Sequence, residues 1–215
     1  MRVWIAYDSV AKPGFEKGWG FSCLVGLEGE RILFDTGWDG NLLLANLKKL
    51  GVRSEGIKRV VISHAHWDHL GGLPQLGRDM ELYVPQSFSE RLKEELAARF
   101  DLHEVRGPQR VCEGVWTTGE LGREVGEQSL VVRTKKGLVV VVGCSHPGVR
   151  RILAKASEFG RVWGLVGGMH GFRDYGALAN LGLIVPSHCT VHKKEILERF
   201  TGVSVEGKAG LEIHL

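Results

Sequence analysis

The chain has 215 residues, of which 43% are hydrophobic and 25% charged, so it can bury a sizeable core and lacks the composition of a disordered protein. Its 28 basic residues barely exceed its 25 acidic ones, which argues against the dense basic surface of a nucleic-acid-binding protein. Glycine, at 30 residues, is roughly twice as frequent as average, which favours a fold with many turns over a helical bundle.

The sequence shows no pattern typical of a membrane-bound or secreted protein. The longest apolar run, Leu138–Val142, is far shorter than the roughly 18 residues of a membrane-spanning helix. The first residues, Met1–Asp8, become polar too early for a signal peptide. Widely spaced cysteines without a C-x-x-C pair indicate reduced thiols; they are Cys23, Cys112, Cys144 and Cys189. We therefore expect a cytoplasmic protein that acts on a small molecule rather than on nucleic acid or a membrane, with a homodimer compatible with the sequence.

The first half of the chain alternates short strands with helices. The predicted elements are a strand Val3–Tyr7, a hairpin of Phe21–Leu27 and Arg31–Phe34, a helix Asn41–Leu50, a buried strand Lys58–Ile62, a strand Glu81–Val84 and a helix from Glu90 to Phe100. Residues 101–127 are rich in turns with short strands, and we interpret them as a segment that faces the substrate.

The second half repeats this order. A hairpin, a helix, a strand and a histidine-bearing loop follow one another again; they are Ser129–Arg133 with Leu138–Val142, Val149–Phe159, Arg161–Val166 and Gly167–His170. Helices Tyr175–Leu181 and His192–Phe200 and terminal strands complete the chain. No linker divides the halves, so we predict one domain, residues 1–215, built from two similar βα halves.

The strongest chemical signal is the run His64-Ala65-His66-Trp67-Asp68-His69, which leaves a buried strand and precedes Gly71-Gly72. Imidazole and carboxylate groups are donors that zinc, manganese and iron accept. Four such groups in six residues, split into an HxH pair and a DH pair, can serve two adjacent metal ions. The alternative, a chance cluster of surface histidines, does not account for the placement between a buried strand and two glycines.

With this run, the chain resembles the metallo-β-lactamase superfamily. The matching segments are Phe34–Gly37, His64–His69 and Val185–His188, which occur in the order that the superfamily has. The segments Gly143–Gly148, Gly167–His170 and His188–Thr190 are similar to the branch of dihydropterin–ribofuranosylaminobenzene phosphate synthase-like proteins. The resemblance implies an α/β fold, a four-layer αββα sandwich of two pseudo-repeated halves, with a two-metal site at one edge of its sheets.

The resemblance also implies roles for individual residues. His64 and His66 would hold one metal ion, and Asp68, His69 and His188 the second. Asp35 would orient the site through hydrogen bonds from outside the ligand set. The expected cofactors are two divalent ions, zinc first, with manganese or iron as alternatives.

The sequence departs from the superfamily pattern at two positions. A histidine expected before the Ser129–Arg133 strand is absent, and that region offers only Glu124, Glu127 and Gln128. The bridging aspartate expected after Leu138–Val142 is replaced by Gly143-Cys144-Ser145-His146. We therefore predict that His146 supplies the missing ligand to the first metal ion, the one that His64 and His66 would hold. Cys144 either bridges the two ions or is a small buried residue that ends the strand.

Four further sets of residues are considered in turn. His170 follows the repeat-equivalent strand and is a ligand, a donor to an oxyanion, a general acid or a bystander beside the cleft. Cys189 is expected to point into the core. Trp38 and Trp67 either line a pocket or, as we expect, pack under the loops. The remaining histidines lack neighbours at ligand spacing and are interpreted as incidental; they are His103, His192 and His214.

The functional hypothesis is a binuclear metal-dependent hydrolase that activates water on a small, anionic ester, phosphoester or amide. Asp68 would position the attacking hydroxide as well as bind metal, and His170 would stabilise the oxyanion or protonate the leaving group. Two alternatives stay open: a synthase that couples a pterin to an aminobenzene ribosyl phosphate, as the branch resemblance implies, and an iron-binding redox protein that uses Cys144.

Overall fold

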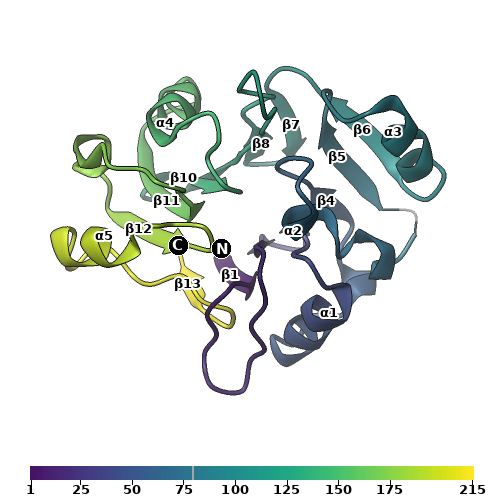
Figure 1. Ribbon diagram of the computed structural model, residues 1–215, viewed down its shortest axis with the longest axis horizontal. Helices are drawn as coiled ribbons and strands as arrows, with labels where there is room; N and C mark the ends of the chain where they lie inside the picture. Colours follow the sequence, from purple (N-terminus) through teal and green to yellow (C-terminus); the bar gives the residue numbers. More distant parts are fainter. Residues whose placement is uncertain (79) are drawn as a thin grey trace.

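Two β-sheets form the centre of the protein in a computed structural model that describes residues 1–78 and 80–215 (Figure 1). The strands of the first sheet are β1 (Arg2–Tyr7), β2 (Ser22–Gly26), β3 (Arg31–Phe34), β4 (Arg59–Val61), β5 (Glu81–Pro85), β6 (Asp101–Val105) and β13 (Glu212–His214). They lie in the order β13-β1-β2-β3-β4-β5-β6.

The second sheet contains the middle and late strands. Its members are β7 (Gln109–Cys112), β8 (Val115–Thr117), β9 (Leu130–Thr134), β10 (Gly137–Val142), β11 (Val162–Gly168) and β12 (Leu183–Ser187). Their order is β12-β11-β10-β9-β8-β7. The segment 101–127 therefore holds the edge strand β6 of one sheet and the strands β7 and β8 of the other, and only its last part is loop.

Helices cover the outer faces of both sheets. They are α1 (Gly40–Lys49), α2 (Trp67–Leu70), α3 (Glu90–Ala97), α4 (Val149–Ser157) and α5 (Lys193–Arg199), with 3₁₀ turns at Ser54–Gly56, Leu73–Gln75 and Tyr175–Leu178. The Asp39 side chain accepts hydrogen bonds from the backbone N–H groups that begin α1, and Ser89 caps α3 in the same way. The predicted helix Tyr175–Leu181 is wrong: only a 3₁₀ turn forms, because the segment is short and contains Gly176.

The repeat predicted from the sequence is present in the strand pairing. In the first sheet β2 and β3 are antiparallel, and β3 then pairs in parallel with β4 after the helix α1. In the second sheet β9 and β10 are antiparallel, and β10 pairs in parallel with β11 after the helix α4. The connections place the carboxyl ends of the parallel strands of each sheet at a common edge.

Three hydrophobic cores correspond to the three interfaces of a four-layer αββα sandwich. Alternation along β1 assigns Ile5 to the central core between the sheets and Ala6 to the core under α1 and α3. Likewise Val141 faces the central core and Val140 faces α4 and α5. The predicted αββα architecture is confirmed. Among the described residues, no helix is long and apolar enough to cross a membrane.

Candidate metal centre

The candidate site lies where strands of both sheets end. Asp35 directly follows β3, and Ser63 and His64 come two and three residues after β4 ends. From the second sheet, β10, β11 and β12 lead into the loops 143–146, 169–171 and 188–191. The paired strand ends therefore bring together segments that are far apart in the sequence, as ligand sites of α/β folds require.

The backbone is strained at this edge. Four non-glycine residues among those described have a positive φ, and all belong to the strand-end segments: Asp35 at 58°, Ser145 at 63°, His170 at 43° and His188 at 43°. Such conformations persist only where the surroundings enforce them, and they concentrate at functional sites.

Three of the predicted ligands form one group of imidazole rings. His64 Nε2 lies 3.0 Å from His66 Nδ1. The ring of His146 lies 4.7 Å from that of His64 and 4.8 Å from that of His66, measured between centroids. The structure therefore brings His146 to the pair His64 and His66, as the sequence analysis expected.

A second group surrounds Asp68 and His69. The Asp68 Oδ2 atom lies 3.1 Å from His188 Nε2 and 3.9 Å from His69 Nε2. The Cys144 thiol sits between the two groups, with its Sγ 3.1 Å from His69 Nε2. Its sulfur is within 4.8 Å of ligand atoms of His64 and His146 on one side and of His69 and His188 on the other.

Asp35 holds the inner histidines in place. Its fully buried carboxylate accepts hydrogen bonds from the Ser63 backbone N–H at 2.6 Å and the Ser63 hydroxyl at 2.8 Å, and it lies 2.7 Å from His69 Nδ1. The Ser63 hydroxyl in turn lies 2.7 Å from His64 Nδ1. When the neutral ring donates its Nδ1–H to Asp35, Nε2, which lies 3.1 Å from Cys144 Sγ, is the nitrogen left to bind a metal ion.

Glu127 has a structural role that the sequence analysis did not find. It lies in the segment where the superfamily pattern expects a histidine ligand, yet its buried carboxylate binds backbone instead. Oε1 accepts from the N–H groups of Cys144 at 3.1 Å and Ser145 at 2.9 Å, and Oε2 accepts from that of His146 at 2.8 Å. Glu127 thereby holds the loop that carries Cys144 and His146, the two residues that replace the expected aspartate and histidine ligands.

Asp8 holds the backbone of His188 in place, as Glu127 holds that of residues 144–146. It follows β1 and is fully buried, and its Oδ2 accepts the backbone N–H of His188 at 2.9 Å while Oδ1 accepts that of Val10 at 3.1 Å. Burial raises the pKa of Asp8 to about 6, against the favourable charge of Lys193. The presence of Asp8 at the site could have been predicted from the sequence, because this carboxylate directly follows a buried strand at the edge where the other site residues lie.

Four histidines of the site favour the neutral form that binds metals, whereas the burial of His69 is outweighed by Asp35 and Asp68, which raise its pKa. Burial, followed by the neighbouring rings, lowers the pKa of His64 well below its usual value, and the same causes lower the pKa of His146 to about 4. Burial also lowers the pKa values of His170 and His188. Burial opposes ionisation of Asp68, but His188 and His69 outweigh it and lower its pKa to about 2.

Other predictions about the surroundings need correction. Cys189 does not point into the core; its Sγ lies within 4.8 Å of ligand atoms of Cys144 and His170. Trp38 and Trp67 are not packed under loops but are 52% and 53% exposed, with ring centroids 6.5 Å apart. The exposed His170 sits 4.6 Å from the ring of His146. The histidines interpreted as incidental lie outside these ligand groups.

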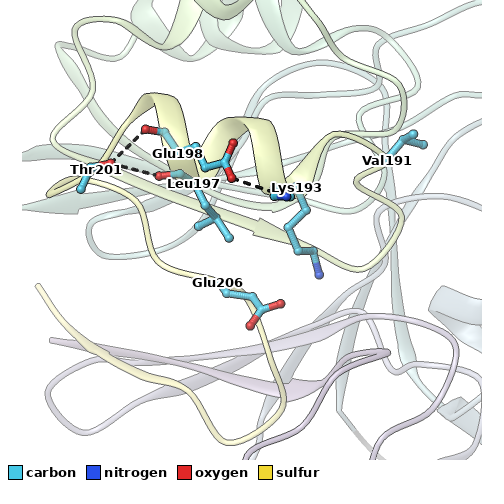
Figure 2. A pocket seen from close by; sticks show the side chains of 7 residues that line it. Val191, Lys193, Leu197, Glu198, Thr201 and Glu206 are labelled. Carbon is cyan, nitrogen blue, oxygen red and sulfur yellow. Dashed lines mark hydrogen bonds and ion pairs between the residues drawn. The ribbon is translucent and has the colours of Figure 1, made fainter.

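Two surface clefts differ in their distance from the histidine cluster. One of about 320 Å³ adjoins the cluster and is lined by Gly122, Arg123, Glu124, Val125, His146, Pro147 and Arg151. The larger one, about 690 Å³, runs along α5 between Lys193 and Glu206 and contains none of the clustered histidines (Figure 2). Of these two clefts, the smaller one is lined by a residue of the cluster, His146.

Comparison with known proteins agrees with this geometry. The metallo-β-lactamase superfamily model matches residues 20–79. A 7,8-dihydropterin-6-methyl-4-(β-D-ribofuranosyl)-aminobenzene-5'-phosphate synthase of Methanocaldococcus jannaschii is 28% identical over 82% of each chain. An N-acyl homoserine lactonase of Bacillus cereus is 31% identical over 44% of this chain and 41% of the lactonase.

Among solved structures, a protein described as a metal-dependent hydrolase of the β-lactamase superfamily superposes with a TM-score of 0.82. It is 29% identical, and the match covers 100% of this chain and 99% of that protein. The HxHxDH run, the two-sheet fold and these matches agree: the chain has the metallo-β-lactamase fold and resembles members of that superfamily in sequence.

Proposed function

We propose that the protein is a metal-dependent hydrolase whose two histidine groups bind divalent ions. One observation carries this proposal: two buried ring nitrogens of the cluster, His146 Nε2 and His188 Nδ1, have no hydrogen-bond partner among the described residues. An unsatisfied buried polar atom costs about 1–3 kcal/mol. Metal coordination removes this cost, and the donor set of neutral imidazoles, a carboxylate and a thiol suits zinc, manganese or iron.

In this proposal His64, His66 and His146 hold one ion, and Asp68, His69 and His188 hold the other. Cys144 lies between the groups, within 4.8 Å of ligand atoms of both, and is the candidate for a shared ligand. Asp35, Glu127 and Asp8 orient these ligands through the hydrogen bonds described above. These three buried carboxylates therefore support the metal-binding residues and are not themselves proposed as metal ligands.

The chemistry divides between the ions and the chain. Two bound divalent ions supply a water of lowered pKa and polarise a carbonyl or phosphoryl oxygen. The low pKa of Asp68, about 2, keeps its carboxylate ionised, so that it orients an attacking water as a hydrogen-bond acceptor. His170 stands at the solvent side of His146 and can donate an N–H to the oxygen on which negative charge develops.

The substrate we propose is a small molecule with an anionic group. The cleft beside His146 is lined by Arg123 and Arg151, and guanidinium groups bind carboxylates and phosphates with two parallel hydrogen bonds. A substrate anchored there would present its ester, phosphoester or amide bond to the histidine cluster.

The test combines metal content with hydrolysis. After loading with Zn²⁺ and dialysis, elemental analysis should find two ions per chain, and His66→Ala should lose at least one. His103→Ala is the control, because His103 stacks on Tyr83 away from the cluster. Hydrolysis of a panel of carboxylate- and phosphate-bearing esters should disappear on chelation and return with metal. An unchanged metal content in His66→Ala would show that the site is wrongly assigned.

A synthase is the second candidate, favoured by one observation. The synthase relative matches 82% of this chain, whereas the lactonase relative matches 44%. Synthase activity requires product formation only when a dihydropterin and an aminobenzene ribosyl phosphate are both present, with no turnover in water alone. The same elemental analysis tests a redox role through Cys144, for which iron with a visible thiolate charge-transfer band is expected.

A further inference from the structure

A third group of metal-ligating side chains adjoins the two histidine groups. Cys144, His170 and Cys189 bring two thiols and one imidazole within 4.8 Å of one another. Cys144 is buried, Cys189 half-buried and His170 exposed, so the group extends from the middle of the cluster to the solvent. The function proposed above uses Cys144 but gives Cys189 no task.

Hydrogen bonds lock the three loops that carry these residues. The Ser145 hydroxyl donates to Gly168 O at 2.7 Å, which joins the loop after β10 to the end of β11. The Thr190 hydroxyl accepts the backbone N–H of Met169 at 3.0 Å, and the N–H of Val191 donates to His170 O at 2.9 Å. The group is thereby preorganised rather than assembled by flexible side chains.

Gly168 makes the close approach of the thiols feasible. A Cβ atom at this position would lie 2.6 Å from Cys189 Sγ and 3.3 Å from the Cα of Cys144. Any side chain at residue 168 would therefore occupy the space in which the Cys189 thiol lies. The absence of a side chain at Gly168 therefore leaves the space that the Cys189 sulfur occupies beside Cys144.

We propose that Cys144, His170 and Cys189 form a capture position for a thiophilic divalent cation, such as Zn²⁺ or Cd²⁺, at the solvent end of the cluster. Two thiolates and an imidazole are a soft ligand set with room for a fourth donor. Because Cys144 also lies within 4.8 Å of ligand atoms of both histidine groups, a Zn²⁺ ion bound there can pass inward by exchanging His170 and Cys189 for histidines, whereas the more thiophilic Cd²⁺ stays with the two thiolates. The inference rests on the proposed metal centre and concerns an adjoining position that shares Cys144 with it.

The experiment titrates Cd²⁺ into the metal-free full-length protein and follows the thiolate-to-cadmium absorption band. The first equivalent should show the intensity of two thiolates in the parent chain and about half of it in Cys189→Ser, since the thiolate is the absorbing ligand. Cys112→Ser, whose thiol lies on β7 outside the ligand groups, should match the parent chain. His170→Ala keeps both thiols and should retain the intensity but bind the first equivalent about tenfold more weakly or worse.

The outcomes separate the two proposals. Equal band intensity in Cys189→Ser and the parent chain, in protein with the parent circular dichroism, overturns the capture position and leaves the histidine centre intact. If Cys189→Ser does not fold, an unchanged first-equivalent affinity in His170→Ala overturns it instead. A parent chain that binds no Cd²⁺ at all overturns the metal centre and the capture position together.

Discussion

Replacing Glu127 by glutamine tests whether this buried carboxylate positions the loop that carries Cys144 and His146. The glutamine oxygen can keep the bonds from the N–H groups of Cys144 and Ser145, but its amide nitrogen would face the N–H of His146, which Glu127 Oε2 now accepts at 2.8 Å. Two donors cannot satisfy each other, so one buried N–H is left unpaired at about 1–3 kcal/mol.

An opposing effect reduces this loss. Burial raises the pKa of Glu127 despite the N–H groups of His146 and Ser145, which means that the buried charge is itself costly. Glutamine removes that charge, and we therefore expect a net destabilisation at the lower end, about 1–2 kcal/mol. Because His146 loses its support, Zn²⁺ affinity should fall about 10- to 100-fold, the range found when residues that orient metal ligands are replaced.

Urea unfolding of the metal-free protein and Zn²⁺ competition with a chelator measure the two effects. Glu124→Gln is the matched control, since it makes the same change at an exposed position three residues away and should leave both quantities unchanged. Parent-like Zn²⁺ affinity in Glu127→Gln would refute the reasoning, because it would mean that the loop holds His146 without the carboxylate.

Three other predictions follow from the geometry. Gly168→Ala should destabilise the protein by about 1–3 kcal/mol in urea unfolding, since its Cβ would meet Gly143 O at 2.5 Å; a parent-like midpoint would contradict this crowding. In the metal-free protein, burial raises the pKa of Asp8 from 3.8 to about 6, so the contribution of Asp8 to stability should fall by roughly 3 kcal/mol as pH rises from about 4 to about 6, while the lowered pKa of His146, about 4, contributes in the opposite direction. The test is the difference in unfolding free energy between the parent chain and Asp8→Asn, which should change by that amount across this range, and a difference that does not depend on pH would contradict the raised pKa. Arg151→Ala should raise KM for an anionic substrate about tenfold with little change in kcat, whereas Arg150→Ala, whose partner is Asp174 outside the cleft, should not, and equal KM values would remove the cleft from the substrate site.

Much of the fold could be predicted from the sequence, because its strands are short apolar runs between glycine-rich turns and its halves repeat. The alternation of side chains along a strand, as at Ile5 and Ala6 or at Val140 and Val141, indicates which residues face the other sheet and which face the helices. The helix expected at Tyr175–Leu181 failed because composition alone did not weigh the entropy of Gly176 against so short a segment.

For the site, the sequence located the residues at strand ends but not the residues that hold them. His146 lies beside His64 and His66 because parallel strands end at one edge, which is a topological rule that a sequence can reveal. Glu127 and Asp8 act through backbone N–H groups of residues 17 and 180 positions away, and no local pattern records such a contact. The direction of Cys189 depended in the same way on a neighbouring glycine of another strand.

The two departures from the superfamily pattern, at Glu127 and at residues 143–146, are linked by hydrogen bonds between them. Where a histidine ligand is expected, Glu127 turns its carboxylate towards the backbone of residues 144–146. Where the bridging aspartate is expected, that same backbone bends through Ser145 at a φ of 63° and delivers Cys144 and His146 to the cluster. The carboxylate at residue 127 stabilises the bend that lets residue 146 take over the imidazole position. We therefore expect the two departures to depend on each other, so that restoring histidine at position 127 alone would remove the support of His146 rather than add a ligand.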